Sequence, residues 1–185
     1  MPCVAKRPVQ CVALLRGINV GGKAKVEMAR LREVVAGVGC DDVRTYINSG
    51  NVLFRDRRSA KTLVPKLERA IEGEFGFPVP VQLRDLAAIR SLCEAIPDDW
   101  TNDKEQKTDV FFIPADLDKP GLLDTIEHDP AIEDVLHAPG AIVWHVSRAN
   151  QGRGHAIDLV RSDLYKRMTI RNVNTVRKLR DLLEP

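Results

Sequence analysis

The 185-residue sequence is poor in aromatic side chains, which make up 5% of it, and it has no long hydrophobic run. Its apolar stretches fall well short of the ~20 residues that a membrane-spanning helix needs. Near the N-terminus, the apolar run Val12–Leu15 is interrupted by Arg16, so it is too short for the core of a secretory signal. The sequence therefore predicts a cytoplasmic protein that does not associate with membranes.

Cysteine and histidine are also scarce, with four of each. Cys3, Cys11, Cys40 and Cys93 form no CxxC pair, so they predict neither a zinc site nor a disulfide framework. The last three lie at or beside apolar positions of expected strands and helices, which is typical of buried, reduced thiols. No histidine has the spacing or the motif context of a metal site or a catalytic triad. We therefore expect no metal and no cofactor, and the sequence identifies no catalytic residue.

Neither sign of charge dominates, because the formal net charge is +2, but the charges are unevenly placed. The segment Glu94–Asp134 contains thirteen acidic residues against three lysines, whereas Arg148–Arg180 contains nine basic residues against two acidic ones. Such a basic segment can bind nucleic acid, and it can equally pack beside acidic residues or remain solvated. Single-stranded nucleic acid therefore stays open as an alternative partner.

The first half of the chain alternates between the patterns of strands and helices. The expected elements are a strand over 9–15, a helix from residue 28, a hairpin over 43–54, a helix over 63–75 and a strand through residue 83. The order β-α-β-β-α-β is that of the split βαβ, or ferredoxin-like, arrangement. A linking helix with apolar residues at Leu86, Ile89 and Leu92 follows, and Pro97 ends it.

The second half repeats this order incompletely. The expected elements are a strand over 108–113, a short helix over 122–126, a hairpin around 139–140, a helix over 157–168 and a terminal helix through 183. The order β-α-β-β-α-α lacks the closing strand of the first half. We therefore predict an α+β fold of two ferredoxin-like halves from a duplication, with mostly antiparallel sheets and helices packed on one face. The expected domains are residues 1–97, including the linking helix, and residues 98–185.

A loop near the N-terminus comes close to a nucleotide-binding signature. Gly17, Gly22 and Lys23 have the spacing of a P-loop, but Ala24 stands where a Ser or Thr would hold magnesium. The helical pattern begins only at Met28, and the element after that helix is a hairpin rather than the next strand of a parallel sheet. A working P-loop is therefore not expected. The loop remains chemically suited to an anion, and it can also be a tight connection with solvated lysines.

Three segments, "ALLRGINVGGKAKVEM", "VRTYINSGNVLF" and "TIRNVNTVRKL", resemble in this order the motifs of a widespread bacterial family of unknown function. The resemblance extends from about Val12 to Leu183. It implies an α+β fold of duplicated ferredoxin-like halves and no established enzyme activity, so the question of catalysis stays open. Family members often carry Ser-Lys after a glycine-rich turn, where this chain has His155 and Ala156.

The motif residues suggest a single anion-binding site, since loops on a rigid scaffold are where ligands usually bind. The first loop would supply backbone N–H groups and Lys23, and Arg171 would grip a phosphate or carboxylate while Asn172 caps the terminal helix or donates to the ligand. The candidate ligand-binding residues are Arg16, Asn19, Gly21, Gly22, Lys23, Ser49, Asn51, Arg171 and Asn172. In the alternative interpretation, Asn19, Ser49 and Asn51 satisfy turn geometry and Arg171 bridges the two halves internally.

Two other functions stay open beside a small anionic ligand. Ferredoxin-like sheets can stack single-stranded bases on aromatic residues, here Phe111, Phe112 and Trp144, but the run that contains the first two has the pattern of a buried strand. The chain can also be a structural or regulatory partner protein, for instance a homodimer formed through an exposed sheet edge.

Overall fold

The computed structural model describes residues 7–22 and 24–184. The chain divides into two compact units, one formed by the part up to Leu86 with residues 182–185, and the other by Ala87–Asp181. The division lies one helix before the expected boundary at Pro97, because the linking helix packs within the second unit. Arg177 of the terminal helix donates there to the carbonyls of Pro97 (2.8 Å) and Trp100 (2.9 Å).

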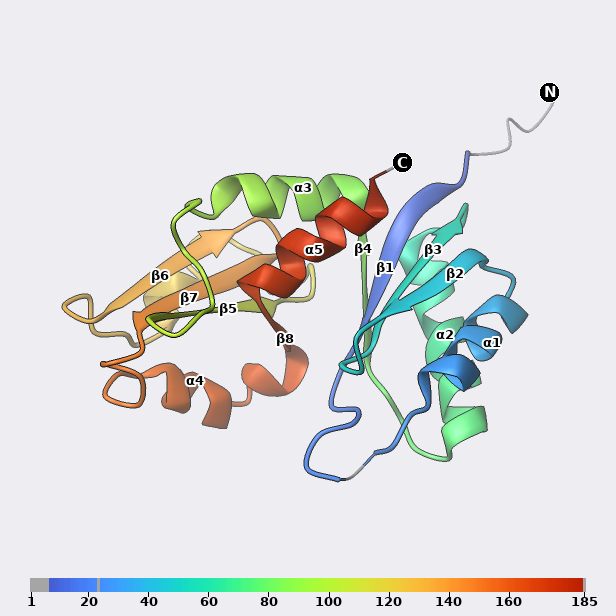
Figure 1. The fold of residues 1–185 in the computed structure, drawn as a ribbon, viewed down its shortest axis with the longest axis horizontal. Helices are drawn as coiled ribbons and strands as arrows, with labels where there is room; N and C mark the ends of the chain where they lie inside the picture. The colour runs from blue at the N-terminus through green and yellow to red at the C-terminus, as the bar shows by residue number, and fades with distance from the viewer. Residues whose placement is uncertain (1–6, 23, 185) are drawn as a thin grey trace. The chain divides into compact units, whose positions relative to one another are not determined.

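The first unit is a four-stranded antiparallel sheet with two helices on one face (Figure 1). Its strands stand in the order β2-β3-β1-β4, which is the ferredoxin-like order. Its elements are β1 (Val9–Leu15), α1 (Met28–Gly37), β2 (Asp41–Tyr46), β3 (Asn51–Asp56), α2 (Ala60–Phe75) and β4 (Val81–Asp85). The predicted order of the first half is therefore confirmed.

Local sequence explains these elements. Strand β1 is buried over its last five residues, as its nearly unbroken apolar composition requires. Helix α2 buries Leu63, Leu67 and Ile71, which recur every four residues and so share one face. Gly76 ends the helix in the left-handed conformation, and its N–H donates to the carbonyl of Glu72.

The second unit contains a sheet of the same order, β6-β7-β5-β8, in which all neighbours are antiparallel. Its elements are α3 (Leu86–Ala95), β5 (Gln106–Phe112), a 3-10 turn η1 (Leu123–Thr125), β6 (Glu133–Ala138), β7 (Ala141–Ser147), α4 (Ala156–Arg161), a 3-10 turn η2 (Tyr165–Arg167), β8 (Thr169–Asn172) and α5 (Val173–Leu183). The duplication is thus complete in strand order, and the α+β class is confirmed.

Three expectations for the elements of the second half were wrong in detail. The closing strand is present as β8, and the expected helix over 157–168 is shorter, because α4 ends at Arg161 and η2 precedes the strand. Strand β8 has only four residues, too few for a strand pattern to stand out beside the helical spacing of Leu164 and Met168. The short helix over 122–126 is a single 3-10 turn.

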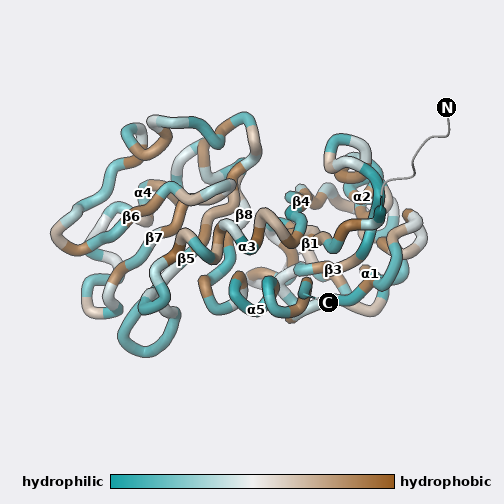
Figure 2. The backbone as a smooth tube through the Cα atoms, turned by 90° about the horizontal axis from the view of Figure 1, so that it is seen from above, coloured by the Kyte–Doolittle hydropathy of each residue, from teal (hydrophilic) through white to brown (hydrophobic). Residues whose placement is uncertain are grey.

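The second sheet carries helices on both faces, whereas one covered face was expected. Helix α4 lies on one side of this sheet, and α3 and α5 lie together on the other (Figure 1). Phe111, Ile142 and Trp144 share a core cluster with Leu159 of α4. Hydrophobic residues are concentrated along the central strands of each sheet, whereas the connecting loops are mostly hydrophilic (Figure 2). No helix in the described part of the chain is both long and apolar enough to cross a membrane.

Candidate functional site

The loop between β1 and α1 contains five residues with left-handed backbone conformations. The backbone angle φ is positive, between 50° and 74°, at Gly17, Asn19, Gly21, Gly22 and Ala24. Glycine adopts this conformation without a steric penalty, which explains three of these residues. The N–H of Asn19 donates to the carbonyl of Ala24 at 3.0 Å and closes the loop into a ring.

The Asn19 side chain holds this ring against its surroundings. Its oxygen accepts the N–H of Val26 at 2.8 Å, and its amide donates to the carbonyls of Val26 (3.0 Å) and Asn48 (2.9 Å). These three bonds connect both ends of the loop with the turn between β2 and β3. Asn19 therefore has the turn-forming role of the alternative interpretation, although it also faces the cavity described next.

A shallow cavity of about 540 Å³ opens beside this loop, at the start of α1. The first-turn amides of α1 have no acceptor within the helix. Glu27 precedes the helix, and its side chain makes no capping hydrogen bond. Lys25 contributes an exposed ammonium, and Glu27 contributes an exposed carboxylate to the same lining. The lining residues are Asn19, Gly22, Lys25, Val26, Glu27, Met28, Ala29 and Asn48.

The other expected residues of the first half have different positions. Lys23 lies outside the described residues. Gly21 belongs to the loop but not to the cavity lining. The backbone N–H of Arg16 donates to the carbonyl of Pro80 at 3.0 Å. Asn51 is fully buried, and its amide donates to the Tyr46 carbonyl (3.0 Å) and to Ser49 Oγ (3.1 Å), so these two side chains shape the hairpin turn.

Gly50 joins this turn to the loop by close packing. A Cβ atom at this position would lie 2.7 Å from Ile18 Cδ1 and 2.8 Å from Leu15 Cβ, and the residue has a φ of +78°. Only glycine satisfies both conditions. The "NSG" motif is therefore explained by packing and turn geometry within the first unit.

Arg171 and Asn172 belong to β8 in the second unit. Arg171 is 8% exposed, and burial lowers the pKa of its guanidinium to about 10, which leaves it charged at neutral pH. Its side chain donates to the Ile170 carbonyl at 2.6 Å. The Asn172 side chain accepts the N–H of Thr175 at 2.8 Å and so caps the start of α5, which is one of the two roles expected for it.

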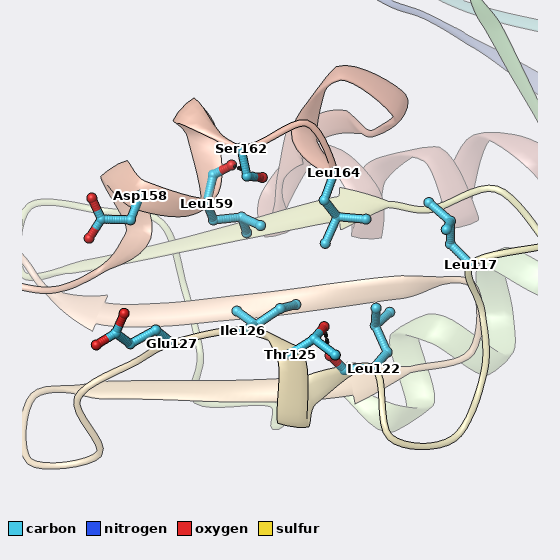
Figure 3. A pocket seen from close by; sticks show the side chains of 9 residues that line it. All are labelled: Leu117, Leu122, Thr125, Ile126, Glu127, Asp158, Leu159, Ser162 and Leu164. Atoms are coloured by element: carbon cyan, nitrogen blue, oxygen red, sulfur yellow. Dashed lines mark hydrogen bonds between the residues drawn. The ribbon is translucent and has the colours of Figure 1, made fainter.

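A second, more apolar cavity of about 460 Å³ lies in the second unit between α4 and the segment before β6 (Figure 3). Five aliphatic side chains form most of its lining, and Glu127 and Asp158 lie on opposite walls at the same end of it (Figure 3). The aliphatic residues are Leu117, Leu122, Ile126, Leu159 and Leu164. Nothing in the spacing of these residues indicated that they would converge, because they come from two irregular segments and one short helix.

Glu133 is a carboxylate that is 3% exposed, and no pattern in the sequence indicated its role. It accepts the Trp144 indole N–H (3.0 Å) and the backbone N–H groups of Asp129 (3.0 Å), His155 (3.0 Å) and Ala156 (3.3 Å). Burial by itself would raise the pKa of Glu133, but these hydrogen bonds prevail and hold the pKa below its ordinary value. Glu133 thus anchors the glycine-rich segment before α4.

No group of three or more His, Cys, Asp or Glu suited to a metal ion exists within residues 7–22 and 24–184. Burial raises the pKa of the Cys11 thiol to about 11, that of Cys40 to about 12, and also that of Cys93. These thiols are buried, as predicted, and they are protonated at neutral pH. Cys3 lies outside the described residues.

Comparison with known proteins agrees with this fold. The profile of a family described as protein of unknown function (DUF1697) matches residues 9–144, a span that includes the first two motif segments but not the third. The structure is similar to that of the conserved bacterial protein SP0830 from Streptococcus pneumoniae, with a TM-score of 0.82, 31% sequence identity, and coverage of 96% of this chain and 99% of that chain. A search of curated proteins gave no match. The chain therefore belongs to the DUF1697 family of proteins of unknown function.

Proposed function

We propose that this protein binds a small anionic ligand, carrying a phosphate or a carboxylate, in the cavity between the Gly17–Lys25 loop and the start of α1. The observation that carries the proposal is the coincidence of a ring-closed glycine loop, a helix start without a side-chain cap and an exposed lysine on one cavity of about 540 Å³. The volume lies within the range of small-molecule sites.

The backbone supports an anion in this position. The first-turn amides of α1 point away from the helix body, and the helix dipole adds partial positive charge there. The hydrogen bonds of Asn19 connect it to Ala24 and Val26 before any ligand binds, so little ordering of these residues would be required on binding. Lys25 would add a charge-assisted hydrogen bond.

Glu27 opposes the anion, because its carboxylate belongs to the same lining. It thereby favours ligands that carry a hydrogen-bond donor or a cation beside the anionic group over bare phosphate. Arg171 and Asn172 have the partners described above within the second unit, and the proposal gives them structural roles rather than ligand contacts.

The test is a titration of the full chain with inorganic phosphate and with phosphorylated and carboxylated metabolites, followed by melting temperature and by amide chemical shifts. We expect a saturable rise in melting temperature and shifts at the amides of residues 24–30. Lys25→Ala should weaken binding roughly tenfold or more, since hydrogen bonds to charged groups contribute about 1.5–3 kcal/mol. Glu27→Gln should strengthen the binding of bare phosphate roughly twofold to fivefold.

Lys66→Ala serves as the control, because Lys66 is an exposed lysine on α2 outside the cavity lining. It removes the same charge from the same unit and should leave the affinity within about twofold. Equal loss of affinity in the Lys25 and Lys66 variants would contradict a specific site and indicate general charge attraction. Absence of binding by every anion at millimolar concentration would refute the proposal.

The nucleic-acid alternative gains no support from the aromatic residues. Phe111, Phe112 and Trp144 are at most 2% exposed, so they cannot stack on bases. A cytoplasmic location remains part of the proposal, and the three buried free thiols agree with a reducing compartment.

A further inference from the structure

The cavity beside α4 has the size and shape of a binding site that the anion proposal does not use. Its volume of about 460 Å³ is comparable to that of small-molecule pockets. One wall comes from α4 and the residues before η2, and the other comes from the segment around η1 (Figure 3). Its nine lining residues all lie between Leu117 and Leu164, within the second unit.

The hydroxyl groups of the lining are already used by the protein. Ser162 Oγ donates to the Leu159 carbonyl at 2.6 Å, and Thr125 Oγ1 donates to the Leu122 carbonyl at 2.7 Å. Both bonds are drawn in Figure 3. The hydroxyls therefore have no proton left for a ligand, and the walls are chemically those of an aliphatic slot.

The remaining polar side chains of the lining are two carboxylates, those of Glu127 and Asp158. Glu127 and Asp158 stand at the same end of the slot, one on each wall (Figure 3). The only basic partner of Asp158 among the described residues is the His155 ring, whose Nδ1 lies 3.2 Å from a carboxylate oxygen. No lysine or arginine is among the lining residues. Aliphatic walls that end at two acids are complementary to a chain that ends in a cation.

We propose that this cavity binds a small amphiphile whose aliphatic chain fills the slot and whose primary ammonium group lies between Glu127 and Asp158. The chain would contact Leu122, Ile126 and Leu159, and removing its methylenes from water would provide most of the affinity. The two carboxylates would select an ammonium over a neutral or anionic head. This site is independent of the loop in the first unit and of the anion proposed there.

A panel of eight-carbon probes tests the proposal on the unmodified full chain. Octylamine, octanol and octanoate present the same chain with a cationic, a neutral and an anionic head. We expect octylamine to bind with at least roughly fivefold higher affinity than octanol, and octanoate to bind most weakly, in titration calorimetry at pH 7 and low salt. Equal affinity for octylamine and octanol, or tighter binding of octanoate, would overturn the proposal.

The length of the aliphatic chain in the probe distinguishes binding of a free amphiphile from binding of a lysine side chain on a protein partner. Each methylene buried in the slot should raise the affinity roughly threefold to fourfold. Butylamine has the length of a lysine side chain, and it should therefore bind much more weakly than octylamine. Comparable affinities for butylamine and octylamine would contradict a slot in which the aliphatic chain provides most of the affinity.

Variants locate the binding within the fold. Replacing both acids, Glu127→Gln with Asp158→Asn, should abolish the preference for octylamine over octanol while octanol binding persists. Leu122→Trp should fill the slot and remove the binding of both probes. Asp163→Asn is the matched control, because its side chain is 94% exposed and lies outside the lining, so this variant should keep the preference. Persistence of the preference in the double variant, with unchanged circular dichroism, would refute the assigned head-group site.

Discussion

At the scale of single residues, most motif positions of the first unit are explained by backbone geometry. The side-chain amides of Asn19 and Asn51 donate hydrogen bonds to backbone carbonyls of their own unit. At Gly50, a Cβ atom would overlap Leu15 and Ile18. The sequence indicated that these polar loop residues were special, but it could not separate ligand contacts from turn contacts. The distinction depends on which acceptor lies within 3 Å, and that is a property of the folded chain.

Gly50→Ala provides the residue-scale prediction. The substitution should lower the free energy of unfolding by about 2–4 kcal/mol, because strain at positive φ adds to overlap with a neighbouring Cβ atom. Gly76→Ala is the matched control, since Gly76 has nearly the same φ of +79° but open space at the Cβ position. The control should cost only about 1 kcal/mol. Urea unfolding followed by circular dichroism measures both, and equal losses would show that the close packing around Gly50 is unimportant.

At the scale of elements, long periodic segments were predictable and short ones were not. Helix α2 and the two hairpins follow from spacing and glycine turns alone. Strand β8 was missed because four residues between a 3-10 turn and a helix carry no periodic signal of their own. The cavity beside α4 could not be predicted for the same reason, since its walls come largely from irregular segments.

The junction of β8 and α5 gives the element-scale prediction. Asn172→Ala should lower the free energy of unfolding by about 1 kcal/mol, because the N–H of Thr175 loses its side-chain acceptor. Asn172→Ser keeps a capping oxygen and should restore most of the loss. Denaturant titration distinguishes the variants. If the serine variant were as unstable as the alanine variant, the capping oxygen would not be the cause.

At the scale of the whole molecule, each unit contains a buried carboxylate that stays ionised. Burial favours protonation of Asp56, but hydrogen bonds from Arg58 prevail and lower its pKa from 3.8 to about 2. Glu133 has a lowered pKa in the second unit for the reason given above. Because the folded state holds both pKa values below those of the unfolded chain, each group stabilises the fold at pH above the unfolded value. This stabilisation is lost as the pH falls through the folded value.

The prediction at this scale is therefore a loss of folding stability at acid pH. Between pH 4 and pH 2 the wild type should lose roughly 2 kcal/mol through Asp56 alone, since one pKa unit corresponds to about 1.4 kcal/mol. Asp56→Asn should be less stable at pH 7 by a similar amount and should show a flatter dependence over this range. Urea midpoints at pH 7, 4 and 2.5 measure the effect. Parallel curves for the two proteins would exclude Asp56 as a source of acid sensitivity.

Both tryptophans of the chain, Trp100 and Trp144, lie in the second unit. Trp144 belongs to the same core cluster as Ile126 and Leu159, which line the aliphatic cavity. Intrinsic fluorescence excited at the indole band is therefore a built-in spectroscopic reporter for one half of the duplication. An emission change on adding a ligand would direct attention to the α4 slot, whereas a ligand of the glycine loop has no indole in its own unit to report it. A screen by fluorescence alone would therefore detect ligands of the cavity beside α4 more readily than ligands of the glycine loop. A screen that treats both sites equally has to measure binding heat or backbone amide chemical shifts.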